Sequence, residues 1–129
     1  IRTGSIDTSL VTTISGSHDR TIYSIDWSPQ HQNLASPASQ RSSIERNVRS
    51  MIATAGGDNL ISIMDVRQRA SDQSQSETNV HTLECSLVYR TQGHELDVNC
   101  VRWRPGTWPP VLASAADDGM IKLWTLTFA

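Results

Sequence analysis

The same residue pattern occurs twice in this chain of 129 residues. In each copy a histidine is followed by a branched apolar residue four positions later and by a tryptophan nine positions later. Further on, an aspartate lies four residues after a hydroxyl residue and six residues before a bulky apolar residue. These positions are His18, Ile22, Trp27, Thr54, Asp58 and Met64 in the first copy, and His94, Val98, Trp103, Ser114, Asp118 and Trp124 in the second. A repeat of this period predicts stacked supersecondary units that bury their apolar faces against one another, and it favours binding over catalysis.

Four short β-strands are predicted for each copy, because runs rich in branched and aromatic residues alternate with turn residues. The segments Gly56–Asn59 and Asp117–Gly119 predict tight turns between the last two strands of each copy. The predicted strands are 10–14, 22–27, 51–55 and 60–64 in the first copy, and 86–91, 98–103, 111–115 and 120–124 in the second. The sequence therefore predicts an all-β chain of two four-stranded antiparallel units.

The two copies differ in length by sixteen residues, which lie in a Ser-, Gln- and Asn-rich insertion at 30–50. We expect a divergent repeat at 8–65, a polar linker loop at 66–82 and a complete repeat at 83–125. The insertion and the linker lack the apolar residues needed to offset the entropy cost of ordering. The insertion is therefore expected to be a solvated loop, and a docking or phosphorylation segment around Ser42 is the alternative.

The charge of the chain gives no sign of a nucleic-acid or membrane partner. A formal net charge of -2 and a pI near 6.0 leave no basic footprint for either of them. The sequence shows neither a signal-peptide pattern nor an apolar run near the roughly 20 residues of a membrane span. Two cysteines, Cys85 and Cys100, do not make a disulfide framework. We therefore expect a soluble intracellular protein in a reducing compartment.

His94, Ser114 and Asp118 are the residue types of a hydrolytic triad, but their context favours a structural network. Ser114 lies in an apolar alternation, without the Gly-x-Ser-x-Gly elbow that exposes a catalytic serine. The indole N–H of Trp124 can donate to this serine, the serine to the histidine, and the histidine to the aspartate. We therefore expect a structural tetrad in the second copy and no catalytic residue.

The first copy contains three of the four members of this network. His18, Thr54 and Asp58 can form the same chain of hydrogen bonds, because threonine replaces serine as donor and acceptor. Met64 has no N–H group, so one end of the network is expected to be missing.

A metal site is a weak alternative. Cys85, Cys100, His81 and His94 could supply ligands, but no two of them have the spacing of a usual zinc motif. We therefore expect no metal site.

Most of the tryptophans are expected in the core. Trp27 and Trp103 end equivalent strands, where their rings would fill the gap between neighbouring sheets. Trp108 lies between Thr107 and Pro109 in a loop, and it is the predicted exposed aromatic anchor for a partner.

The second copy resembles the WD repeat, whose family fold is the β-propeller. Gly93-His94 is followed by a V-x-x-V-x-W strand and by the string LASAADDGMIKLW. The first copy is similar, but it has Gly16-Ser17-His18 for Gly-His and Met64-Asp65 for Trp-Asp. The strings HDRTIYSIDW, IATAGGD, HELDVNCVRW and LASAADDGMIKLW are similar, in this order, to the last two C-terminal repeats of the WD-repeat protein of the cytosolic iron–sulfur protein assembly (CIA) targeting complex.

This resemblance implies that the chain holds two blades of a larger, seven-bladed ring, since a propeller needs at least about four blades. It implies a non-catalytic scaffold without a cofactor, which binds adaptor and scaffold subunits and helps to present client apoproteins for [4Fe–4S] insertion. Two cysteines cannot ligate such a cluster alone. The implied location is the cytoplasm, with the nucleus as a second one. We expect a piece of a longer chain, because no Met begins it, and a natural C-terminus after Trp124.

The resemblance also implies where partners dock, because certain WD-propeller positions point to the face where many partners bind. By position these residues are Thr21, Tyr23 and Gly57 in the first copy, and Asp97, Asn99 and Asp117 in the second. Tyr23 is the expected anchor, since it offers a rigid apolar ring with a polar tip. Asp97 and Asp117, near Glu95, favour a partner with Arg or Lys. Alternatively, each of these is a solvated rim residue.

Two other functions are alternatives. A WD-repeat adaptor of another complex, such as a ubiquitin-ligase substrate receptor or a chromatin subunit, would have the same fold, since fold does not fix function. A serine hydrolase using Ser114 is the remote alternative.

Overall fold

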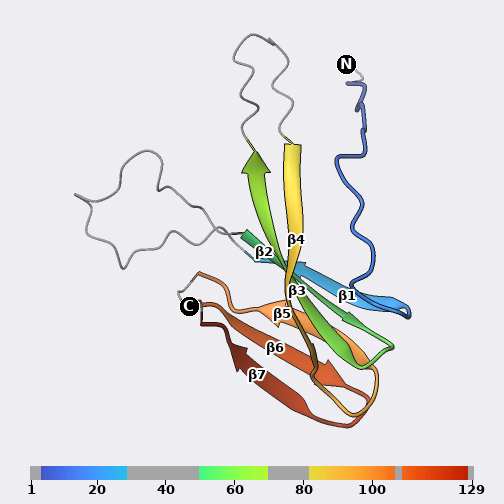
Figure 1. Ribbon diagram of the computed structural model, residues 1–129, viewed down its shortest axis with the longest axis vertical. Coiled ribbons are helices and arrows are strands. Elements are labelled where there is room, and N and C mark those ends of the chain that lie inside the picture. The colour runs from blue at the N-terminus through green and yellow to red at the C-terminus, as the bar shows by residue number, and fades with distance from the viewer. Residues whose placement is uncertain (1–3, 29–49, 70–81, 107–108, 128–129) are drawn as a thin grey trace, which may run out of the picture.

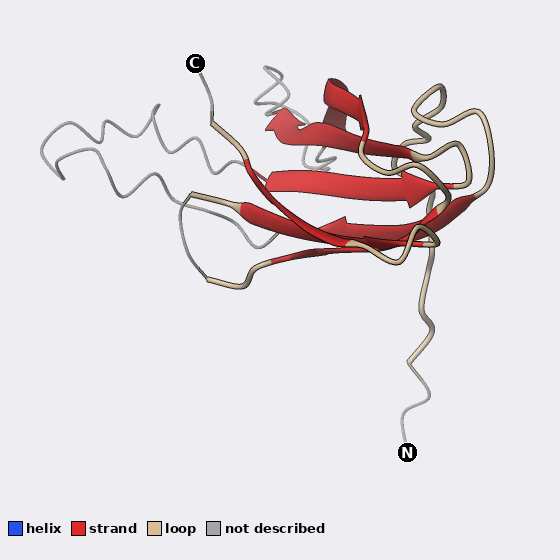
Figure 2. Cartoon of the chain, turned by 90° about the horizontal axis from the view of Figure 1, so that it is seen from below, coloured by secondary structure: helices blue, strands red, loops and turns tan. Residues whose placement is uncertain are grey.

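A computed structural model of the chain describes residues 4–28, 50–69, 82–106 and 109–127. Within these ranges the chain consists of strands and loops (Figure 2), so the all-β prediction is confirmed. The strands are β1 (Ile22–Trp27), β2 (Ser50–Gly56), β3 (Leu60–Arg69), β4 (Thr82–Gln92), β5 (Val98–Trp103), β6 (Val111–Ala116) and β7 (Ile121–Thr125). No helix in the described ranges has the length and hydropathy needed to cross a membrane.

The strands form two antiparallel sheets, with the orders β1-β2-β3-β4 and β5-β6-β7 (Figure 1). The expectation of two four-stranded units is therefore wrong in how it divides the strands. Residues 86–91 lie within β4, which pairs with β3 in the first sheet, and residues 10–14 form no strand. The open edge of β3 takes up the next extended segment along the chain, because unpaired backbone groups at a sheet edge need partners.

The third strand of the first sheet is also longer than predicted. It continues to Arg69, into the stretch at 66–82 that we expected to be a linker loop. The register pairs Val66 with Cys85 and Arg69 with Thr82, so β4 covers the whole length of this strand.

The two sheets repeat each other in local detail. Tyr23 is an extra residue where β1 pairs with β2, and Asn99 is an extra residue at the same place between β5 and β6. The turns that follow match as well, with positive φ at Asn59 (67°) and Gly119 (76°). These are residue types that tolerate the left-handed conformation, so both predicted hairpins have the turn chemistry that their backbone requires.

The main core lies between the two sheets. Its first-sheet side comes from β2 and β3, and its second-sheet side from β5 and β6. The buried residues are Met51, Ala53, Ala55, Ile61, Ile63, Val98, Val101, Trp103 and Leu112. The expectation for the tryptophans holds for Trp103, which is 6% exposed, but it is wrong for Trp27, which is 53% exposed. No sheet of the described chain packs on the face of β1 that carries Trp27.

Candidate functional site

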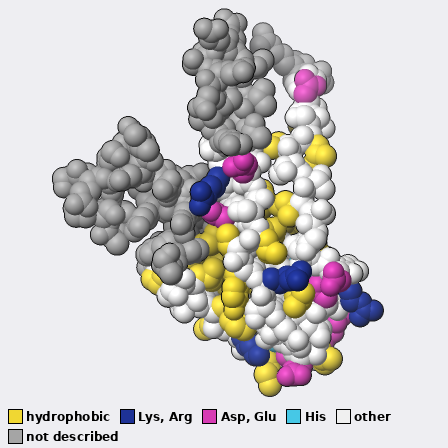
Figure 3. Space-filling model, viewed as in Figure 1, with side chains coloured by type: hydrophobic (Ala, Val, Ile, Leu, Met, Phe, Trp, Pro, Cys, Tyr) yellow, Lys and Arg dark blue, Asp and Glu magenta, His cyan; other side chains and the backbone are white. Residues whose placement is uncertain are grey.

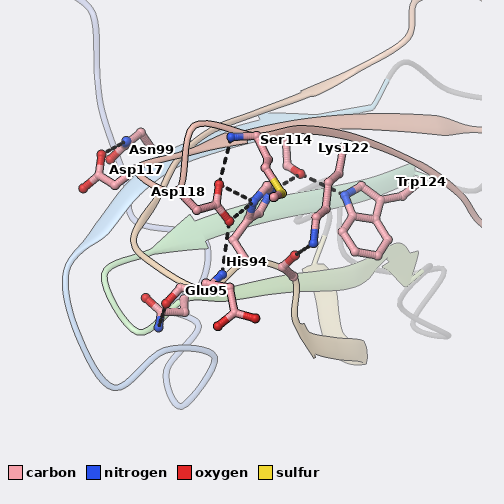
Figure 4. A network of polar contacts seen from close by, with 11 residues as sticks. His94, Glu95, Asn99, Ser114, Asp117, Asp118, Lys122 and Trp124 are labelled. Carbon is pink, nitrogen blue, oxygen red and sulfur yellow. Dashed lines mark hydrogen bonds and ion pairs between the residues drawn. The ribbon is translucent and has the colours of Figure 1, made fainter.

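The second-copy residues of the predicted tetrad meet between β6, β7 and the segment before β5 (Figure 4). Trp124 Nε1 lies 2.9 Å from Ser114 Oγ, and His94 Nε2 lies 2.7 Å from the same oxygen. His94 Nδ1 lies 2.9 Å from Asp118 Oδ2. The geometry thus joins two strands of the sheet to the loop that precedes it.

The donor of each hydrogen bond in this network follows from the groups at the two ends of the network. The indole of Trp124 can only donate, so Ser114 Oγ accepts from it and has its own proton left for His94 Nε2. The carboxylate of Asp118 can only accept, so His94 donates from Nδ1. Ser114 is 2% exposed, and a serine enclosed in this way lacks the approach path that a nucleophile needs. The arrangement suits a strand-to-loop link better than hydrolysis.

Backbone groups complete the binding of Asp118. The N–H groups of Met120 and Glu95 donate to its carboxylate at 3.0 and 3.2 Å. Burial by itself would raise the pKa of this carboxyl group. The hydrogen bonds, including that of His94, outweigh burial and hold the pKa of Asp118 below its ordinary value. The aspartate is therefore kept ionised and orients the histidine.

The first copy has the same geometry, without the indole. His18 lies 2.9 Å from Asp58 through Nδ1 and 2.8 Å from Thr54 Oγ1 through Nε2. Burial would raise the pKa of Asp58, but hydrogen bonds from His18 and from the N–H groups of Asp19 and Leu60 lower it below the ordinary value. The structure therefore brings together all seven residues of the two predicted networks.

Each network histidine has a further support that the sequence did not predict. Ser62 Oγ donates to the carbonyl of Ser17 at 2.8 Å, and Lys122 Nζ donates to the carbonyl of Gly93 at 2.8 Å. Each carbonyl belongs to the residue before the network histidine, and each donor comes from the third strand of its sheet. The shared position in the repeat was the only sequence signal, since a serine and a lysine do not look equivalent.

The six docking candidates other than Trp108 gather at one end of the two sheets, and we call them the rim cluster. They are Thr21, Tyr23, Gly57, Asp97, Asn99 and Asp117. The carbonyls of Thr21 and Asp97 each accept the N–H of the residue before the network aspartate, Gly57 and Asp117, both at 2.9 Å. Because a β-bulge re-aims the side chain of its extra residue, the bulges at Tyr23 and Asn99 bring these two side chains to the rim.

The rim cluster spans both sheets. Tyr23 Oη lies 3.5 Å from Asp97 Oδ2, a long contact between the sheets, and Asn99 Nδ2 donates to Asp117 Oδ1 at 2.5 Å. Tyr23 is half-exposed, and Asn99 and Asp117 are exposed. The cluster therefore presents an aromatic ring and two carboxylates at an accessible edge. Trp108, the other docking candidate, lies outside the described residues.

Metal-ligating residues do not gather in the described part of the chain. No group of three or more His, Cys, Asp or Glu side chains there is arranged to hold a metal ion. Cys85 and Cys100 are free thiols, and burial raises the pKa of Cys85. His81, a member of the alternative ligand set, lies outside the described residues.

The family model described as "WD domain, G-beta repeat" matches residues 8–65 and 85–125, which is most of the chain. The chain belongs to the WD-repeat family. The four-stranded and three-stranded sheets are consistent with blades of a larger WD-repeat ring.

Curated relatives of this chain are named for cytosolic iron-sulfur protein assembly. The chain is 38% identical over 114 residues to the probable cytosolic iron-sulfur protein assembly protein Ciao1 of Anopheles gambiae, and 31% identical over 114 residues to CIAO1 of Mus musculus, which has the same description. It is also 36% identical over 114 residues to Protein CIA1 of Arabidopsis thaliana. Each match covers 88% of this chain but only 25 or 26% of the relative. The chain thus spans about a quarter of the length of the curated relatives it matches.

Proposed function

We propose that this chain forms two adjacent blades of a seven-bladed WD propeller that acts as a non-catalytic scaffold in cytosolic iron–sulfur protein assembly. The observation that carries the proposal is the similarity over 88% of the chain, through both repeats, to proteins named for that process. We assign the repeats to 8–65 and 83–125. The cytoplasm is the proposed location, because those names place the process in the cytosol.

The two hydrogen-bonded networks have a structural role in this proposal. Each ties a buried histidine to a β-hairpin turn through an aspartate and to a strand through a hydroxyl. Satisfied networks of this kind fix one arrangement of strands, because any slip leaves buried polar groups unpaired. Rigid sheets then hold the rim residues at fixed positions.

The rim cluster is the proposed docking surface for adaptor and scaffold subunits or for client apoproteins. Tyr23 supplies a large contact area at low entropy cost, which is typical of residues that dominate binding energy. Asp97 and Asp117 favour a segment that carries Arg or Lys, because charge-assisted hydrogen bonds to carboxylates are strong. These contacts require a surface and no reacting group, which fits a scaffold.

The docking surface can be tested in the complete protein with Tyr23→Ala and Asp117→Lys together. Both side chains are accessible, so we expect at least about tenfold weaker capture of the co-purifying subunits with an unchanged Tm. The conservative pair Tyr23→Phe and Asp117→Glu keeps the ring and the charge and should bind normally. Quantitative affinity purification measures both pairs, and unaltered capture by the first pair would refute the surface.

The assembly role has a separate test. Depletion of the complete protein should lower the activity of cytosolic [4Fe–4S] enzymes while their polypeptide levels stay constant. Re-expression should restore this activity, and the Tyr23→Ala and Asp117→Lys protein should restore less of it. Normal cluster content after depletion would refute the role.

A further inference from the structure

β1 and β5 are the first strands of the two sheets, and each is called the inner strand of its sheet. The two inner strands are joined by side-chain to backbone hydrogen bonds. β5 is an edge strand, so one of its sides has no strand partner in the described chain. Ser24 Oγ of β1 accepts the N–H of Val101 at 3.1 Å, and Asp26 Oδ2 accepts the N–H of Trp103 at 2.6 Å. The indole N–H of Trp103 donates to the carbonyl of Asp26 at 3.1 Å. Two acceptor side chains of β1 thus satisfy the edge of the next inner strand.

The repeat places different chemistry at these two positions of the second copy. Cys100 stands where the first copy has Ser24, and Arg102 stands where it has Asp26. A thiol is a weak acceptor and a guanidinium has no acceptor at all. The second sheet therefore cannot bind the edge of a following strand in the way that β1 binds β5.

The face of the second sheet that carries these residues is open in the part of the chain that the structure describes. Ile121 on β7 is 77% exposed, whereas Ile61, at the same position of the first sheet, is 2% exposed beneath the second sheet. Figure 3, which views the molecule from the same side as Figure 1, shows further apolar side chains at the surface of the described chain. By the repeat, the open face is where a further sheet would pack, next to the exposed Arg102.

A second copy of this chain has a matching apolar face but the wrong polar groups. Ile25 and Trp27 are 64% and 53% exposed, whereas their equivalents Val101 and Trp103 are 0% and 6% exposed. If β1 of a second copy packed on the open face, the N–H groups of its Ile25 and Trp27 would meet no good acceptor. A guanidinium would also face these donors, which costs binding free energy.

We propose that the open face of the second sheet receives a β-sheet whose inner strand presents a carboxylate to Arg102, and that Cys100 and Arg102 exclude a second copy of this chain. A carboxylate is the group that a guanidinium binds best, with two parallel N–H bonds. The inference rests on the proposed ring, in which a further sheet packs at this place. These two residues thus select which neighbour follows the second sheet.

The exclusion of a second copy can be tested with the 129-residue chain itself. Cys100→Ser with Arg102→Asp restores the two acceptors, so the variant should associate head to tail at about tenfold lower concentration than the wild type. The control, Arg104→Asp with Cys100 unchanged, makes the same charge change on another exposed residue, restores no acceptor and should behave as the wild type. Adding Ile25→Lys to the first variant should abolish the gain.

Sedimentation velocity over a concentration series measures this association, with circular dichroism to match the folded fractions. Equal association of the wild type and the acceptor variant would overturn the exclusion. A gain that survives Ile25→Lys would overturn the proposed contact. Neither result bears on iron–sulfur assembly, so a failure here is distinct from a failure of the proposed function.

The carboxylate is tested in the longer protein with Arg102→Lys and a zero-length carbodiimide cross-linker. This reagent couples amines to carboxylates in contact, so mass spectrometry should find position 102 joined to an Asp or Glu of a neighbouring inner strand. Arg104→Lys is the matched control and should give no such product. Folded protein in which position 102 joins no carboxylate would overturn this part of the proposal.

Discussion

Ser114→Ala should lower the free energy of unfolding by about 3 kcal/mol, because one buried hydroxyl serves two other groups. Ser114 Oγ accepts from Trp124 Nε1 at 2.9 Å and pairs with His94 Nε2 at 2.7 Å. An unsatisfied buried polar group costs about 1–3 kcal/mol. His94 is buried and Trp124 is partly exposed. The unpaired Nε2 of His94 therefore contributes more of this cost than the unpaired indole N–H of Trp124. For a chain of this size the loss corresponds to a Tm lower by about 10 °C.

The matched change in the first copy is Thr54→Val, which removes the hydroxyl at constant shape. Only His18 Nε2 then loses its partner, so the expected cost is smaller by about 1 kcal/mol. Trp124→Phe in the Ser114→Ala background removes the orphaned donor and should show a coupling energy of about 1 kcal/mol. Equilibrium urea unfolding measures all these values. A cost for Ser114→Ala below about 0.5 kcal/mol, or no coupling to Trp124, would refute the reasoning.

Acid should destabilise the fold, since the folded-state pKa values of Asp58 and Asp118 lie below the ordinary 3.8. The stability that these two carboxylates contribute is fully present above pH 3.8 and is lost as the pH falls through the folded-state pKa values. Thermal unfolding scans from pH 6 to about pH 2 should therefore show Tm decreasing below about pH 4. The double change to Asn should flatten this dependence, and an equally steep decrease would contradict the assignment. Gly93→Ala should cost about 1–3 kcal/mol in urea unfolding, because a Cβ there would lie 2.6 Å from Cδ1 of the buried Ile61. Ser17→Ala, at the equivalent position that already carries a side chain, is the control, and equal costs would count against the close approach.

Much of this fold is local enough to be read from the sequence. The predicted strands 22–27 and 98–103 have the bounds of β1 and β5. The spacing of His94, Ser114 and Asp118 also predicted the side chains that meet, because histidine, hydroxyl and aspartate recur at matched intervals in both copies. Side-chain alternation and turn residues carry this information within a few positions along the chain.

The features that were mispredicted or missed depend on distant partners. Which sheet β4 joins is decided by the open edge of β3, and the burial of Trp103 compared with Trp27 is decided by which sheet packs in front of each. Asp26 reads as an ordinary polar residue of a strand, and its role emerges only when β5, 77 residues later, comes within reach. Such choices are made by tertiary contacts, which local patterns do not encode.

The membership of β4 in the first sheet has a consequence for synthesis. The first sheet gains its fourth strand only when residue 92 has left the ribosome, although the first repeat ends at residue 65. Because domains fold as units during synthesis at about 5–20 residues per second, the nascent first repeat spends about one to five seconds with the edge of β3 exposed. A deletion or fusion made at the repeat boundary would make that exposure permanent, whereas a cut after Gln92 would leave the first sheet whole.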